Sequence, residues 1–254
     1  MPAIITLLTD FGSRDSYVAE VKGVIASQAN PALLIDITHE VPPGDVHAAQ
    51  YIFARVWPRF PQGTVHVVVV DPGVGTARRA IAAEAAGHFF VAPDNGLLTS
   101  LPAEARFVEL PVPPGASPTF HARDLFALAA AQIVNGTALT HLGHSITDPV
   151  RTPLPVARKD GASWVGEVVY VDRFGTLISN IPGAGVGPAA RVRVGDRDVG
   201  LVRRTFGEVP SGQLVAFVGS GGMVEVAVRG GSAAEALGIG VRGEVRMDSP
   251  TRSS

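Results

Sequence analysis

The sequence predicts an α/β fold: an N-terminal three-layer, mostly parallel α/β domain followed by a small antiparallel β-barrel domain. In the first half, short apolar runs alternate with segments of helical periodicity, as in a parallel sheet covered by helices. Prolines and charged residues interrupt this pattern near residue 150. Beyond it, short apolar segments separated by glycine-rich turns favour a barrel. We therefore expect domains at residues 1–152 and 163–254, joined by a linker at residues 153–162.

In the first half, four short apolar runs predict strands, and three segments with apolar residues at helical spacing predict helices. The strands are Ile4–Thr9, Leu33–Ile37, Thr64–Val70 and His88–Ala92. The helices are Tyr17–Ala29, Val46–Val56 and Leu125–Val134. The third strand is rich in β-branched residues, which is typical of a strand buried on both faces. Asp45 directly precedes the second helix, where an N-cap is expected.

The second half shows seven short runs of strand character separated by turns. They are Trp164–Val171, Leu177–Ile181, Ala190–Val194, Val199–Val202, Leu214–Val218, Met223–Val228 and Glu244–Met247. Helical spacing is limited to the short stretch Ser232–Leu237. Strands of this length with so little helix are expected to form one small barrel or sandwich.

The amino-acid composition indicates a globular protein and argues against a nucleic-acid partner. The 254 residues are 46% hydrophobic and 17% charged, enough apolar material for a sizeable core. A net charge of -2 argues against a nucleic-acid partner.

The absence of cysteine excludes disulfides, thiolate metal sites and a cysteine nucleophile. His141 and His144 are followed by no third ligand, so no metal site is expected. The apolar runs are too short for a signal peptide or a membrane span, which predicts a cytoplasmic protein without a membrane partner.

The two halves of the chain carry opposite charge. Residues 1–150 contain eight basic and thirteen acidic side chains, a balance of −5. Residues 151–254 contain thirteen basic and ten acidic side chains, a balance of +3. This contrast suggests two units that face each other, within one chain or between chains.

Aspartates follow the predicted parallel strands, where α/β sheets bind ligands. Asp36 and Asp94 are interpreted as caps or turn residues. Asp10 and Asp71 differ because glycine-rich loops follow them and allow a ligand close to the backbone. The loop after Asp71 fails the dinucleotide fingerprint because Arg78 stands where the third glycine is required. We therefore expect this loop to direct side chains, Arg78 among them, rather than to hold phosphate.

Five segments, in order along the chain, together resemble the S-adenosyl-L-methionine (SAM) hydroxide adenosyltransferases. They are Thr9–Gly12, Thr64–Arg79, Pro93–Leu98, Thr119–Asp124 and Asp172–Gly175. These adenosine-forming hydrolases are related to fluorinating and chlorinating enzymes. The resemblance implies an N-terminal α/β domain, a C-terminal β-barrel and a homotrimer. It also implies sites where one subunit's N-domain meets a neighbour's C-domain, which fits the opposed charges.

The resemblance implies a water-activating triad at Asp71, Arg78 and His121. The implied reaction converts SAM into adenosine and methionine by attack of water on the ribose C5′, with no cofactor and no metal. The chemistry suits these residues, since a sulfonium leaves readily and the enzyme must chiefly position a nucleophile. Halogenating relatives carry Tyr in place of Asp71. A carboxylate there would repel a halide, which favours water.

Substrate contacts are implied by the same resemblance. Asp10 matches the residue that binds the ribose hydroxyls, and Asp172 matches the partner of the methionine ammonium. Phe174 and Phe206 match the rings that flank adenine. Ser220 matches a serine that binds the methionine carboxylate.

At other positions the match to the family is weaker, or the residue differs from that of the relatives. The backbone near Gly230 matches the segment that reads the adenine edge, and Glu225 is placed at the rim of the pocket. Thr176 stands where relatives have an adenine-reading Asn. Gly221 replaces an Arg of the halogenases, and Gly44 replaces a pocket Trp of the fluorinating enzyme. The last two differences separate this chain from the halogenases.

Two alternatives stay open. The first is a halide-dependent 5′-halo-5′-deoxyadenosine synthase, against which Asp71 argues. The second is a non-catalytic nucleoside-binding protein. The complete set of Asp71, Arg78 and His121 argues against the second, since a binding protein has no need to hold water at C5′.

Overall fold

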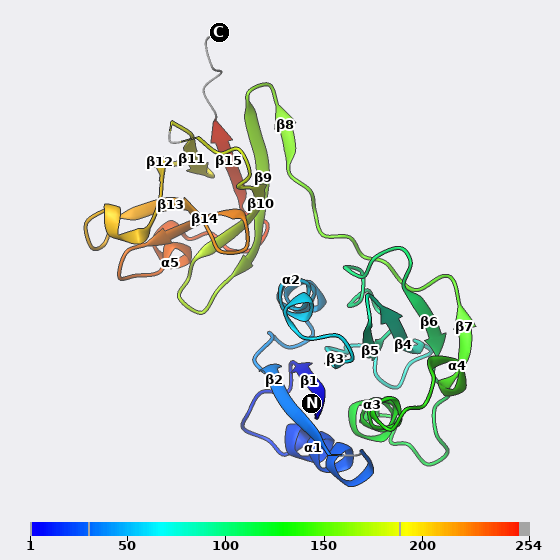
Figure 1. Cartoon of the computed structure of the whole chain (residues 1–254). Coiled ribbons are helices and arrows are strands. Elements are labelled where there is room, and N and C mark those ends of the chain that lie inside the picture. The colour runs from blue at the N-terminus through cyan, green and yellow to red at the C-terminus, as the bar shows by residue number, and fades with distance from the viewer. Residues whose placement is uncertain (1, 30, 188, 249–254) are drawn as a thin grey trace. The chain divides into compact units, whose positions relative to one another are not determined.

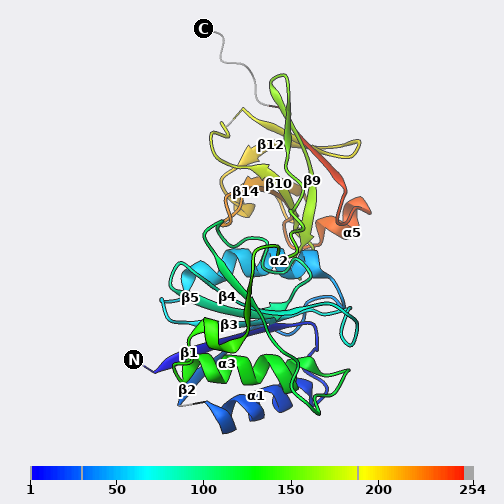
Figure 2. The same cartoon turned by 90° about the vertical axis from the view of Figure 1, so that its right-hand side faces the viewer.

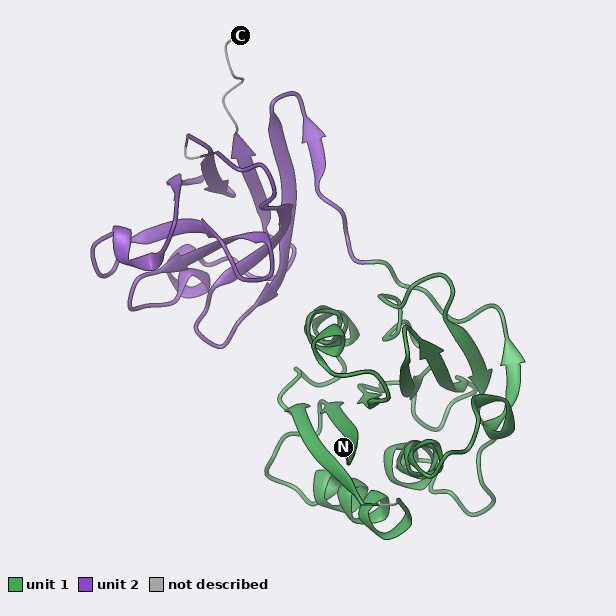
Figure 3. Ribbon diagram, in the orientation of Figure 1, with its two compact units in different colours: residues 1–153 green, residues 154–254 purple. Residues whose placement is uncertain are grey.

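The computed structural model describes residues 2–29, 31–187 and 189–248, which form two compact units (Figures 1 and 3). Unit 1 comprises residues 1–153 and unit 2 residues 154–254. The segment expected to be a linker includes a short strand, β8 (Arg158–Asp160), which pairs with the first long strand of unit 2. No helix in the described ranges has the length and apolar character needed to cross a membrane.

Unit 1 contains a seven-stranded sheet of order β2-β1-β3-β5-β4-β6-β7. Its parallel part consists of the four predicted strands, observed as β2 (Ala32–Thr38), β1 (Ala3–Thr9), β3 (Val65–Val69) and β5 (His88–Pro93). Its antiparallel part was not predicted and comprises β4 (Ala80–Ala85), β6 (Arg106–Glu109) and β7 (His144–Ile146). Strand β4 is rich in alanine, which has low strand propensity. The other two are too short to show an alternating pattern.

Helices cover both faces of this sheet, as predicted for three layers. Figure 2 shows α2 (Val46–Val56) on one face, and α1 (Tyr17–Gln28) and α3 (Ala127–Val134) on the other. Asp45 caps α2, as expected, by accepting a hydrogen bond from the Ala48 N–H at 2.9 Å. The third helix begins earlier than predicted, with a π-helical turn, η2 (Ala122–Phe126). Unit 1 also contains η1 (Trp57–Arg59) and α4 (Leu139–Leu142).

Unit 2 is a closed barrel of seven strands in the order β10-β14-β13-β12-β11-β15-β9, with β9 pairing back to β10. The strands are β9 (Ser163–Val171), β10 (Leu177–Pro182), β11 (Arg191–Val194), β12 (Arg197–Arg203), β13 (Leu214–Val218), β14 (Met223–Val228) and β15 (Glu244–Asp248). All were predicted. The barrel is antiparallel except for the parallel pair β12–β13. A short turn, η3 (Phe206–Glu208), and the helix α5 (Ala233–Leu237) complete it.

A row of buried, hydrogen-bonded polar side chains crosses the sheet of unit 1 beneath α2. Nδ1 of His66 lies 2.7 Å from the Thr6 hydroxyl, and its Nε2 lies 3.2 Å from Nδ1 of His88. His66 is fully buried and packs against the rings of Phe53 and Phe90. Burial, and secondarily the nearby His88, lower the pKa of His66 to about 3. The ring is therefore neutral in the folded protein at ordinary pH.

This burial should make the folded state sensitive to acid. In the unfolded chain His66 takes a proton near its ordinary pKa of 6.5, whereas in the folded protein it does so only near pH 3. Protons therefore bind the unfolded chain preferentially between these values, and stability falls as the pH decreases from 6.5 towards 3. The contribution of this ring is at most about 1.4 kcal/mol per pH unit.

We predict that His66→Phe reduces this pH dependence, because Phe suits the surrounding rings and cannot bind a proton. Urea unfolding of both proteins at pH 7 and pH 4.5 measures the difference. An equal loss of stability in the two proteins would contradict a neutral, buried His66.

Candidate active site

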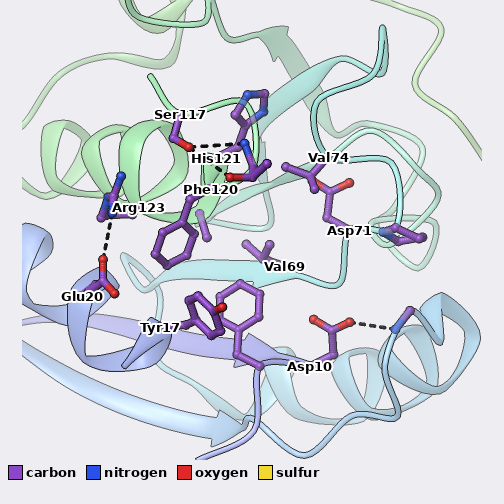
Figure 4. Close-up of a pocket in the computed structure, with 15 residues that line it drawn as sticks. Asp10, Tyr17, Glu20, Val69, Asp71, Val74, Ser117, Phe120, His121 and Arg123 are labelled. Carbon is purple, nitrogen blue, oxygen red and sulfur yellow. Dashed lines mark hydrogen bonds and ion pairs between the residues drawn. The ribbon is translucent and has the colours of Figure 1, made fainter. Parts of the chain in front are cut away.

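A cavity of about 570 Å³ opens at the carboxyl ends of the central parallel strands of unit 1 (Figure 4). Asp10 directly follows β1, and Asp71 lies two residues after β3. Thr9 and Val69 are paired in the register of these strands, so both aspartates emerge at the same edge of the sheet. His121 comes from the loop before η2 and lines the same cavity. The fold thus brings together three site residues that are far apart in the sequence.

Arg78 holds Asp71 in a two-pronged ion pair. Its Nε lies 3.0 Å from both carboxylate oxygens, and its Nη2 also contacts Oδ2. The side chains are only 10% and 6% exposed, respectively. The Arg78 guanidinium also lies over the ring of Phe126, 5.4 Å from its centre. Planar pairs of this kind fix both partners in one orientation.

The same guanidinium group contacts His121. Nη2 of Arg78 lies 3.0 Å from Nδ1 of His121. A guanidinium can only donate, so Nδ1 accepts and the ring proton of neutral His121 lies on Nε2. Burial, and then the positive charge of Arg78, lower the pKa of His121, while Asp71 and Asp124 act in the opposite direction. Asp71, Arg78 and His121 therefore form one connected cluster with a neutral imidazole.

Gly75 allows the two loops of this cluster to approach each other. Its φ is +77°, and a Cβ at this position would lie 2.7 Å from the carbonyl oxygen of Pro118. Only glycine meets both requirements. The loop that carries Arg78 can therefore lie against the loop that leads to His121.

The other aspartates expected at strand ends have different partners. Oδ2 of Asp10 accepts a hydrogen bond from the Gly44 N–H at 2.8 Å, and its side chain lines the cavity. Asp94 is buried and binds Arg79 and the backbone N–H of Val150. Asp36 pairs with Lys22 and His39. Asp94 and Asp36 thus have structural partners, but Asp36 lies within β2 and is neither a helix cap nor a turn residue.

Unit 2 contains a second cavity, of about 650 Å³, that gathers most of the remaining predicted site residues. The predicted residues that line it are Asp172, Phe174, Thr176, Phe206, Glu225 and Gly230. Phe174 is 74% exposed, and the ring of Phe206 packs on Phe217 at 4.5 Å. Ser220 lies in the turn between β13 and β14 and does not line this cavity.

Asp172 has a structural role in this second cavity. Its Oδ1 accepts hydrogen bonds from the backbone N–H groups of Phe174 and Thr176, each at 2.9 Å. These contacts fix the turn between β9 and β10 and present the exposed ring of Phe174. A role in binding the methionine ammonium would have to use the other carboxylate oxygen.

The sequence analysis missed five residues with aromatic or charged side chains that line the first cavity. They are Phe11, Tyr17, Glu20, Phe120 and Arg123. Three of them lie within the motifs quoted for the family resemblance, which was the available signal. Tyr17 and Glu20 belong to the first turn of α1, and nothing in the sequence showed that this turn faces the cavity.

Arg123 ties this part of the wall together. It contacts Glu20 at 2.8 Å and Asp124 at 2.6 Å, and its guanidinium lies 4.8 Å from the centre of the Phe120 ring. Asp124 in turn accepts the N–H of Ser117 at 2.8 Å. These contacts join α1 to the loop and the π-helical turn that flank His121.

Comparison with protein families gives two matches. Residues 5–143 match the model of the SAM hydroxide adenosyltransferase N-terminal domain. Residues 166–246 match the model of the SAM hydroxide adenosyltransferase C-terminal domain.

Curated relatives include an (R)-S-adenosyl-L-methionine hydrolase of Thermus thermophilus, 45% identical over 92% of this chain and 95% of the relative. The corresponding hydrolase of Salinispora tropica is 40% identical over 92% of this chain and 94% of the relative. A fluorinase of an Actinoplanes species is 30% identical over 76% of this chain and 80% of that protein.

Solved structures show the same fold. An uncharacterized conserved protein from Thermotoga maritima matches with a TM-score of 0.88 and 34% identity, covering 96% of this chain and all of that one. A conserved hypothetical protein from Thermus thermophilus matches with a TM-score of 0.80 and 43% identity, covering 97% of this chain and all of that one.

The contact between Arg78 and His121 leads to a prediction for the imidazole. At pH 7 nitrogen NMR should show neutral His121 with its proton on Nε2. Arg78→Gln should raise the pKa of His121, because it removes a positive charge and leaves Asp71 without its partner. Arg106→Gln, at an exposed ion pair, is the control and should leave the titration unchanged. A His121 that is doubly protonated at pH 7 in the native protein would refute this assignment.

Proposed function

The chain belongs to the SAM hydroxide adenosyltransferase family, and we propose that Asp71, Arg78 and His121 hold the water molecule that attacks its substrate. The enzyme hydrolyses S-adenosyl-L-methionine to adenosine and methionine. The observation that carries the proposal is the single guanidinium of Arg78, which binds Asp71 and His121 at once. Asp71 and His121 line the cavity, whereas Arg78 is not among its lining residues.

The residues suit a direct displacement at the ribose C5′. Asp71 accepts a hydrogen bond from the water, and the Nε2–H of His121 donates to the water oxygen. This directs a free lone pair at C5′. As the O–C5′ bond forms, the C5′–S bond breaks and its electron pair passes to sulfur, which leaves as the neutral thioether of methionine. Asp71 takes the proton that the water loses.

The same cluster favours water over a halide. The carboxylate of Asp71 lies where a halide would have to bind, and the positive charge of Arg78 only neutralises that carboxylate. The pair therefore offers no net attraction to an anion that has lost its hydration shell. A water molecule, in contrast, can donate to the carboxylate.

The substrate contacts belong to the same proposal. Asp10 accepts from the ribose hydroxyls, since Gly44 already orients its carboxylate from the other side. Phe174 and Phe206 flank the adenine, and the backbone at Gly230 reads its edge, with Thr176 and Glu225 beside them. Asp172 and Ser220 receive the amino-acid end of the substrate.

We further propose a homotrimer, in which unit 1 of one subunit and unit 2 of its neighbour complete each site. The support is that each unit carries its own cavity and its own share of the predicted residues. The opposite charges of the two halves are consistent with this arrangement.

Isotope labelling tests the reaction. In ¹⁸O-labelled water, one label should appear on the 5′-oxygen of adenosine, because SAM carries sulfur at C5′ and has no oxygen there. Added chloride should change neither rate nor product. Unlabelled adenosine, or 5′-chloro-5′-deoxyadenosine, would overturn the proposal.

In the same assay Asp71→Asn and His121→Gln should lower kcat by about 10²- to 10⁴-fold with a smaller effect on KM. Asp36→Asn, outside the cavity, is the matched control and should retain activity.

Mixing inactive variants tests the shared site. One variant is Asp71→Asn, and the other is the double variant Phe174→Ala/Phe206→Ala. Co-expressed in equal amounts, they should recover about one quarter of the native activity, since a random trimer forms that fraction of sites from two intact halves. Light scattering should give the mass of a trimer. Failure to recover activity in a confirmed mixed trimer, or a fully active monomer, would contradict the shared site.

A further inference from the structure

We propose that Phe11, Tyr17 and Phe120 form an aromatic wall that recognises the positive charge of the substrate's sulfonium. With Glu20, this wall would let the enzyme distinguish SAM from a neutral thioether of the same shape. The inference rests on the proposed function and adds a specificity determinant to the site.

The three rings form one mutually packed group in the first cavity. Their centres are 6.0 Å apart for Phe11 and Tyr17, 6.1 Å for Phe11 and Phe120, and 5.3 Å for Tyr17 and Phe120. Each pair meets edge to face. Figure 4 shows the rings of Tyr17 and Phe120 turned into the cavity, across from Asp71. A phenyl face near a cation attracts it through the ring quadrupole.

The charges around the cavity also favour a cation. Among the described residues, its lining includes the carboxylates of Asp10, Glu20 and Asp71 and the guanidinium of Arg123, a balance of −2. Counting the direct partners Arg78 and Asp124 adds one charge of each sign and leaves this balance unchanged. The positive charge of Arg123 is bound by two carboxylates, so it does not oppose a second cation beside Phe120.

The reaction geometry directs the sulfonium towards this wall. Direct displacement requires the attacking oxygen and the departing sulfur to lie on opposite sides of C5′. The oxygen is held by Asp71 and His121, so the sulfur points away from them. The part of the cavity that faces Asp71 is the aromatic group with Glu20 beside it (Figure 4).

This placement has a kinetic consequence. The sulfur is positive in the bound substrate and becomes neutral as the C5′–S bond breaks. The wall therefore stabilises the ground state more than the transition state, so weakening it should raise KM without lowering kcat. S-adenosyl-L-homocysteine has the same nucleoside and amino-acid ends but a neutral sulfur. Its binding should not depend on the charge-recognising part of the wall.

The experiment compares KM and kcat for SAM with the inhibition constant of S-adenosyl-L-homocysteine. Tyr17→Leu should raise KM for SAM by about tenfold, or about 1.4 kcal/mol, with kcat unchanged or higher and the inhibition constant shifted less than threefold. Glu20→Gln should act in the same direction. Tyr17→Phe keeps the ring and should restore the low KM for SAM that Tyr17→Leu loses. Tyr51→Leu, on α2 and outside the cavity, is the matched control.

The outcomes are distinguishable. An equal loss of affinity for SAM and for the neutral thioether would mean that the rings provide packing only, and it would overturn the inference. A fall in kcat with unchanged KM would also overturn it. Native enzyme that releases no adenosine from SAM would instead refute the proposed function, before any variant is compared.

Discussion

The site depends on one interaction, the buried pairing of Arg78 with Asp71 and His121. A buried carboxylate and a buried guanidinium are each costly alone, and the two-pronged contact offsets much of that cost while fixing both orientations. The same guanidinium determines the tautomer of His121 by donating to Nδ1. Because the three side chains hold one another in place, a water molecule bound there meets donors and acceptors that are already oriented. Preorganisation of this kind lowers the cost of aligning a nucleophile.

The surrounding fold places the side chains of this cluster in position. Parallel strands β1 and β3 deliver Asp10 and Asp71 to one edge of the sheet, and a glycine with positive φ lets the loop of Arg78 contact the loop of His121. The π-helical turn directly after His121 is a local departure from regular helix of a kind often found at functional sites. Behind the cluster, Arg79 joins Asp94 to Asp148 and so fixes the residue next to Arg78. Regular strands and paired loops thus position the side chains of the cluster.

The relationship to fluorinases raises the question of which nucleophile this cluster selects. In the proposed reaction the sulfonium is the leaving group, so the choice of nucleophile depends on the few groups that surround C5′. Here Asp71 is compensated by Arg78 and retains oxygen atoms that can accept from water. The pocket therefore provides a hydrogen-bond acceptor rather than net positive charge, and water can donate to this acceptor whereas a halide cannot. In our proposal, the aromatic side of the cavity binds the positive charge of the leaving group.

The sequence alone determined most of the fold, because the parallel strands and the barrel strands carry clear apolar runs. It did not reveal β4, β6 and β7, whose alanine content or shortness leaves no pattern. The resemblance to the SAM hydroxide adenosyltransferases implied the set of Asp71, Arg78 and His121, whereas His121 carried no signal of its own in the sequence. Only the tertiary structure showed that one guanidinium joins the other two, that Asp172 builds a turn, and that the first turn of α1 faces the cavity. The reason is physical: local patterns reflect burial along one element, whereas a site depends on distances between elements that are remote in the chain.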